Sequence, residues 1–74
     1  MATFIYSVIF IKESFVEAIQ FYYSRVDAIG GFKKVLKRSY PHLTDDQCFC
    51  YSKEGIYIDN LNRITVNLIT TKIR

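Results

Sequence analysis

The segment Thr3–Ile11 has the composition of a β-strand with two largely apolar faces. Side chains alternate between the two sides of a strand, so one side carries Phe4, Tyr6, Val8 and Phe10, and the other carries Thr3, Ile5, Ser7, Ile9 and Ile11. This pattern is typical of an interior strand in a sheet that is covered on both sides. The chain has 74 residues, half of them hydrophobic, and domains seldom have fewer than about 50 residues. We therefore expect a single domain, residues 1–74, built around this strand.

A helix is predicted after the first strand. Ser14 and Glu17 form an S-x-x-E capping box, which is typical of a helix that begins at Phe15. Apolar residues then recur at helical spacing. The pair Gly30-Gly31 favours the end of this helix, because glycine is the usual residue of a helix C-terminal cap.

A second helix is predicted for residues Phe32–Arg38. Its apolar side chains are rotated away from the apolar stripe of the first helix when the helical numbering is continued. A single straight helix would therefore point its two halves in different directions, and we expect a break at the glycines. Pro41 ends the second helix, because the residue before a proline disfavours helical geometry.

Residues 44–54 fit two structures. Thr44 and Gln47 form another capping-box pattern, and Gly55 suits a C-terminal cap, which together predict a short helix. The runs Cys48–Tyr51 and Ile56–Ile58 are strand-like and are separated by a glycine-containing turn, which predicts a hairpin. We favour the hairpin and keep the helix as the alternative.

The C-terminal part of the chain predicts a turn at Asp59–Arg63 and a final strand from Arg63 to Ile73. The expected fold class is α+β, a small β-α-α-β-β-β domain with an antiparallel sheet and helices packed on one face. The last strand is much longer than the predicted hairpin strands. Its extra backbone must therefore bond to the first strand, to water or to another chain.

Phe21 and Arg25 are predicted to lie one turn apart on the first helix, with Phe21 on its polar side. An aromatic residue beside an arginine is a combination enriched at interface hot spots. The chain also has twelve aromatic residues, six Phe and six Tyr. Small domains without disulfides or a structural metal are often stabilised by oligomerisation. We therefore expect a protein-binding accessory factor that acts as a homodimer, with Phe21 and Arg25 as its protein-binding residues.

Four of the ten basic residues lie inside the predicted second helix, in a stretch of six positions: Lys33, Lys34, Lys37 and Arg38. With Lys53 at the tip of the predicted hairpin, they form a candidate nucleic-acid-binding surface. The net charge of +3 is small for such a role. Nucleic-acid binding through these residues is therefore the alternative function.

Cys48 and Cys50 together with His42 supply three potential zinc ligands, with Asp45 or Asp46 as a fourth. The C-x-C spacing differs from that of a common zinc knuckle, and thiols often behave as small hydrophobic groups. We expect two thiols in the core, with no metal and no cofactor.

His42 also raises the hypothesis of a small nuclease, because RNA cleavage needs little more than a histidine, a basic neighbour and a tyrosine such as Tyr40. A chain of this length buries only about 60% of its unfolded surface and has little left to enclose a deep cleft. We therefore expect a protein that is not an enzyme and keep the His42-dependent nuclease as the second alternative.

The apolar segment Phe4–Ile11 is far shorter than the roughly 20 residues that span a bilayer, and it lacks the flanks of a signal peptide. We expect a cytoplasmic location and no membrane partner. Residue types with AT-rich codons, such as Ile, Phe, Tyr and Lys, greatly outnumber Gly, Ala, Arg and Pro. This bias is common among tailed phages and also among many bacteria. Together with the small size of the chain, it leads us to expect a phage accessory protein that modulates or inhibits a host protein by occluding its surface.

Overall fold

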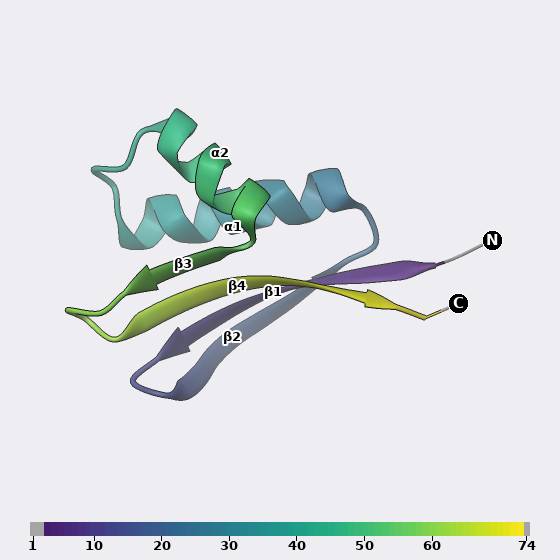
Figure 1. Ribbon diagram of the computed structural model, residues 1–74, viewed down its shortest axis with the longest axis horizontal. Helices are drawn as coiled ribbons and strands as arrows, with labels where there is room; N and C mark the ends of the chain where they lie inside the picture. The colour runs from purple at the N-terminus through teal and green to yellow at the C-terminus, as the bar shows by residue number, and fades with distance from the viewer. Residues whose placement is uncertain (1–2, 74) are drawn as a thin grey trace.

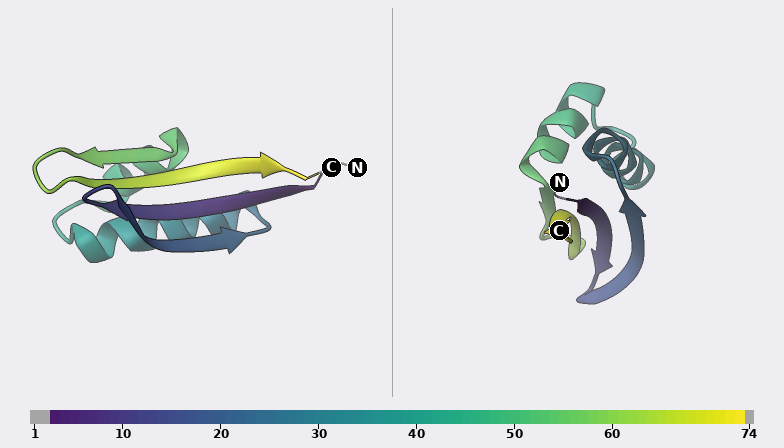
Figure 2. Two further views of the ribbon diagram at one scale, coloured as in Figure 1. Left: turned by 90° about the horizontal axis from the view of Figure 1, so that it is seen from below. Right: turned by 90° about the vertical axis from the view of Figure 1, so that its right-hand side faces the viewer.

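The computed structural model describes residues 3–73 and shows a four-stranded antiparallel sheet with two helices on one face (Figures 1 and 2). In chain order the elements are β1 Phe4–Lys12, β2 Phe15–Tyr22, α1 Arg25–Ser39, α2 Asp45–Glu54, β3 Ile56–Asp59 and β4 Ile64–Lys72. The strands are ordered β2-β1-β4-β3 across the sheet. The expected α+β class, with an antiparallel sheet and helices on one face, is confirmed. The expected element order is wrong, because the second element is a strand.

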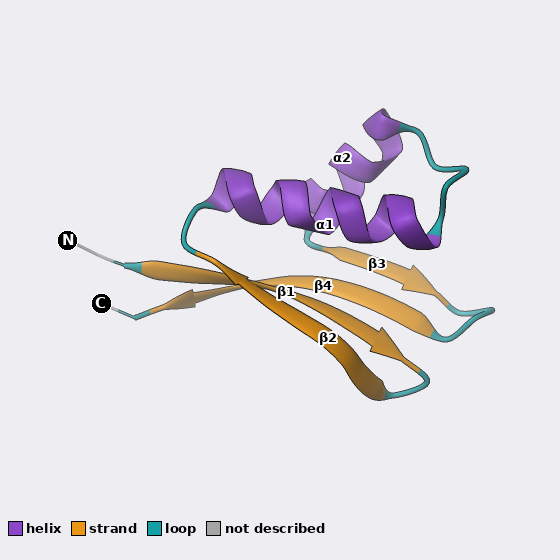
Figure 3. Cartoon of the chain, turned by 180° about the vertical axis from the view of Figure 1, so that it is seen from behind, coloured by secondary structure: helices purple, strands orange, loops and turns teal. Residues whose placement is uncertain are grey.

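The helix predicted from Phe15 is replaced by the hairpin of β1 and β2 (Figure 3). Glu13 and Ser14 form its two-residue turn with φ values of 52° and 71°. Two consecutive positive φ angles match the type I′ turn, which suits the twist of paired strands. The turn was not predicted, because the two central positions of a type I′ turn usually carry Asn or Gly and here carry Glu13 and Ser14. The S-x-x-E pattern favoured a helix instead.

Helix α1 runs without interruption through Gly30 and Gly31, so the predicted break is wrong. The helix begins after Ser24, whose side chain accepts a hydrogen bond from the backbone N–H of Asp27. Gly31 is buried, and a Cβ added there would overlap the hydroxyl and ring of Tyr22. This glycine therefore allows α1 to lie close to the end of β2.

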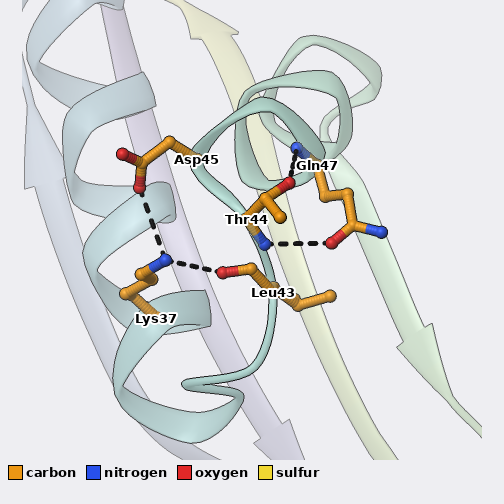
Figure 4. Close-up of polar contacts among 5 residues, drawn as sticks. All are labelled: Lys37, Leu43, Thr44, Asp45 and Gln47. Atoms are coloured by element: carbon orange, nitrogen blue, oxygen red, sulfur yellow. Dashed lines mark hydrogen bonds and ion pairs between the residues drawn. The ribbon is translucent and has the colours of Figure 1, made fainter.

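Residues 45–54 form helix α2, so the favoured hairpin is wrong and the alternative helix is correct. Thr44 and Gln47 form the reciprocal capping box, with N···O distances of 3.1 and 2.9 Å (Figure 4). Gly55 ends the helix with a φ of 79°, in the left-handed region that favours glycine. Lys53 consequently lies in the last turn of α2 and not at a hairpin tip.

The core lies between the helices and the two central strands. It contains the buried residues Val8, Phe32, Leu36, Tyr40, Leu43, Cys48 and Val66. Strands β1 and β4 pair along their whole length, from Phe4 with Lys72 to Lys12 with Ile64. The predicted long last strand is thus confirmed, and the first strand is the partner of its extra backbone. No helix within residues 3–73 has the length and apolar character to cross a membrane.

Candidate functional site

The face of the sheet opposite the helices is a candidate binding surface, and we call it the open face. Residues paired across antiparallel strands point to the same side of a sheet, and the register places Ile9 beside Ile19 and Asn67. The same register assigns the remaining members to this face: Ile5, Ser7 and Ile11 of β1, Val16 and Phe21 of β2, Ile56 and Ile58 of β3, and Thr65, Ile69 and Thr71 of β4.

The open face is apolar and exposed. Six of its large hydrophobic side chains are 41–66% exposed: Val16, Ile19, Phe21, Ile56, Ile58 and Ile69. The left panel of Figure 2 shows that neither helix covers this side of the sheet. Contiguous apolar patches of more than a few hundred Å² are rare on monomers and mark interaction sites.

The prediction that the first strand is covered on both sides is wrong for the described chain. Val8 on the helix side of β1 is 3% exposed, whereas Ile9 on the open face is only half-buried and has no described layer above it. The apolar pattern of both faces was nevertheless read correctly. An apolar face that is uncovered in a single chain is typical of a surface that binds a partner.

Phe21 and Arg25 are not one turn apart on a helix. Phe21 lies on the open face of β2, opposite Ser7 and 66% exposed, whereas Arg25 is the first residue of α1. The structure therefore separates the aromatic–arginine pair into two elements. As protein-binding residues they remain a prediction, and Phe21 has the more favourable position because it adjoins the exposed isoleucines.

The basic run of α1 divides between two sides of the helix. Lys33 faces α2, where its Nζ lies 5.8 Å from the centre of the Phe49 ring, and Lys53 lies 5.4 Å from the same ring. Lys37 donates a 2.6 Å hydrogen bond to the Leu43 carbonyl and lies 3.4 Å from an Asp45 carboxylate oxygen (Figure 4). These contacts tie α1 to α2 and the loop between them.

Lys34 and Arg38 line a groove of about 370 Å³ between α1 and β2. Its apolar lining includes Val8, Phe10 and Ala18 from the sheet. The structure thus brings two of the predicted basic residues together, but beside the edge of the sheet and apart from Lys33, Lys37 and Lys53.

The potential metal ligands do not assemble. Cys48 is buried, as expected of a core thiol, but Cys50 is exposed, so the expectation of two core thiols is half wrong. Within residues 3–73, no three His, Cys, Asp or Glu side chains gather in a group that suits a metal ion. His42 is exposed and meets the ring of Tyr40 edge-on, with centroids 6.1 Å apart.

The hydroxyl of Tyr40 points to the turn after β3 and not to His42. It donates a 2.7 Å hydrogen bond to Asp59, whose carboxylate also accepts hydrogen bonds from Leu61 and Asn62. Burial and the nearby carboxylate raise the pKa of Tyr40 well above its usual value of 10.0, and the same hydrogen bonds lower the pKa of Asp59. Tyr40 is therefore a structural tyrosine that connects α1 to the β3–β4 turn.

Sequence reasoning missed the exposed residues of β2 and β3 that complete the open face, among them Ile19, Ile56 and Ile58. The available signal was the apolar character of both sides of β1, which required a cover on each side. Comparisons of this chain with protein-family models, with curated proteins and with solved structures find no match.

Proposed function

We propose that this protein is a non-enzymatic binding module that acts as a homodimer, with the open faces of two copies packed against each other. The observation that carries the proposal is that both faces of β1 are apolar and that residues 3–73 cover only one of them. The second copy supplies the missing layer, and the helices and sheet edges of the dimer remain available to bind another protein.

The open face has the minimum area expected of a dimer interface. Adjacent strands are about 4.8 Å apart and each residue advances the strand by about 3.4 Å. The four strands contain 9, 8, 4 and 9 residues, so the face covers roughly 500 Å². Covering it on two copies removes about 1,000 Å² of surface, which is the least expected of a biological interface and less than the roughly 1,200–2,000 Å² of standard ones. Packed sheets of this kind form a layer about 10 Å thick.

The charge distribution also favours a second copy. The chain carries a formal charge of +3, yet none of the residues that the register pairs on the open face is charged. The one charged residue of β2, Glu17, lies unpaired at the bulge. The paired residues of two copies therefore stack without like charges in contact, which would otherwise oppose association. A two-fold dimer brings the same surface of both copies together, so this apolar face would pack against its own copy.

The test compares two lysine substitutions of exposed apolar residues by light scattering. Ile19→Lys places a charge on the open face, and Val26→Lys places the same charge on α1, where Val26 is 78% exposed. We expect twice the 8.7 kDa chain mass for the wild type and Val26→Lys, and the single-chain mass for Ile19→Lys. A wild type that stays monomeric at about 1 mM would associate by less than about 4 kcal/mol, and the proposal would be wrong.

A second candidate function, nucleic-acid binding, has its own observation. Lys33 and Lys53 both lie beside the ring of Phe49, which is 45% exposed, and an aromatic ring among cations is the arrangement that stacks a base while contacting phosphates. The expected result is single-strand binding that weakens steeply with salt and is lost in Phe49→Ala. Retention of binding in that variant contradicts this candidate.

A further inference from the structure

The groove between α1 and β2 borders the free edge of the sheet. β2 is the outermost strand on this side, so within residues 3–73 its eight residues have a strand partner on one side only. The right panel of Figure 2 shows α1 end-on above β2, with α2 above the opposite side of the sheet. An unpaired edge presents a row of backbone N–H and C=O groups that another strand can pair with.

The side of the groove formed by α1 is cationic. Lys34 and Arg38 are four residues apart, so they lie on the same side of the helix. None of the described residues that line the groove is acidic. Within residues 3–73 the ion pair of the basic run is that of Lys37 with Asp45, so neither Lys34 nor Arg38 is neutralised by a described carboxylate.

The sheet side of the groove is apolar at its floor and polar toward its end. Val8, Phe10 and Ala18 form the floor. Tyr22 lies against Gly31 of α1 and donates a 2.5 Å hydrogen bond to the side chain of Gln20. The sheet therefore lines the groove with apolar and uncharged polar side chains, and the charge of the groove comes from α1 alone.

We propose that this groove binds an extended acidic peptide segment of a partner protein, which adds to the edge of β2 as a fifth strand. An edge strand beside a helix is the arrangement used in peptide recognition by strand addition, where backbone hydrogen bonds give affinity and side chains give specificity. Alternate side chains of the added strand point to the helix side of the sheet. Acidic residues at those positions meet Lys34 and Arg38.

The spacing of the two cations matches such a strand. Four residues of a helix advance about 6 Å along its axis, and alternate residues of a strand are about 6.8 Å apart. Acidic side chains at positions i and i+2 of the peptide thus fall at nearly the separation of Lys34 and Arg38. A second copy of this chain fits less well, because pairing β2 with β2 brings two cationic pairs to one edge, and β2 contains a single acid, Glu17.

The inference rests on the proposed protein-binding function but does not require the dimer, because strand addition uses the edge of β2 and the dimer uses its open face. The experiment measures fluorescence anisotropy of a labelled peptide as long as β2, with alternating Glu and Val. The comparison peptide has alternating Lys and Val. We expect the Glu peptide to bind at low salt, the Lys peptide not to bind, and binding to weaken as salt rises.

Protein variants locate the site. Lys34→Glu and Arg38→Glu should each weaken binding by about tenfold, whereas Lys33→Glu, on the side of α1 that faces α2, should leave it nearly unchanged. N-methylation of alternate peptide amides that face β2 should abolish binding, because strand addition needs those N–H groups. Equal binding of the methylated peptide, or an equal effect of Lys33→Glu, overturns the inference.

Two further outcomes distinguish peptide binding in the groove from nucleic-acid binding and from the proposed dimer. The first is that a single-stranded oligonucleotide displaces the peptide and binds the Lys34→Glu variant more weakly than the wild type. That result would assign the groove to nucleic acid and overturn the proposal of an acidic peptide. The peptide assay is repeated with Ile19→Lys, the variant expected to be monomeric. Binding by that variant supports the groove whether or not the wild type dimerises, and no binding by a dimeric wild type refutes the groove alone.

Discussion

Gly30 and Gly31 are adjacent in α1 and differ in their surroundings, which makes them a matched pair for substitution by alanine. A Cβ at Gly30 meets no described atom within 4 Å, whereas a Cβ at Gly31 overlaps the ring of Tyr22. In the interior of a helix, alanine is more favourable than glycine by about 0.8–1.0 kcal/mol. This gain is common to both sites, so the difference between the two variants isolates the contact with Tyr22.

The two substitutions are expected to differ in their effect on stability. Gly30→Ala should raise the free energy of unfolding by about 1 kcal/mol, or the Tm by about 4–8 °C for a domain of this size. At Gly31 the ring of Tyr22 must move, and overpacking of this kind costs about 1–3 kcal/mol. Gly31→Ala should therefore be less stable than Gly30→Ala by about 1–3 kcal/mol.

Urea unfolding followed by circular dichroism measures the difference, with all variants at one protein concentration because the proposed dimerisation would make stability concentration-dependent. In a Tyr22→Ala background the ring is absent, and the two glycine substitutions should then have equal effects, as a double-mutant cycle would show. Equal stabilisation by both alanines in the wild-type background would refute the close approach of α1 to β2. A penalty at Gly31 that persists without Tyr22 would refute its assignment to that ring.

Three further results are expected from the rest of the fold. Asp59 has a lowered pKa, so its contribution is present above the unfolded pKa of about 3.9 and is lost as pH falls through the folded value. Asp59→Asn should thus be less stable at pH 7 in thermal unfolding and should lose part of the decline in stability between neutral and acid pH. Thr44→Ala removes the capping box of α2 and should lower the free energy of unfolding by about 1 kcal/mol in urea titrations. A thiol reagent should modify exposed Cys50 in the native protein and leave buried Cys48 unreacted until unfolding, as peptide mass mapping would show.

The central strands and the turn between β3 and β4 were predictable, because their sequences are strongly apolar or carry several turn-forming residues. β2 was not, and its bulge explains why. The register shifts between Phe10 and Ile11 and leaves Glu17 without a partner, so Val16, Ile19 and Phe21 all reach the open face. Their spacing of three and then two residues breaks the alternation of a strand and resembles a helical period.

The helices were mispredicted where a tertiary contact or a competing pattern outweighed the local signal. A glycine pair is a common end of a helix, but Gly31 lies within α1 because it makes room for Tyr22, a residue nine positions earlier. Likewise, the capping box at Thr44 correctly indicated α2 and was outweighed by the strand-like run that follows it. Part of the candidate site lies on β2, which was predicted as a helix. Phe21 was therefore singled out, but its position beside Ile19 on a sheet was missed.

The packing of two open faces is tested most directly by nuclear Overhauser effects between isotope-labelled and unlabelled chains in a mixed sample. We predict intermolecular contacts from the methyl groups of Ile9, Ile19 and Ile69, which the register places on the open face. We predict none from Val26, which is exposed on α1. The absence of intermolecular contacts from the three isoleucines, or contacts that arise from the helices instead, would contradict the account.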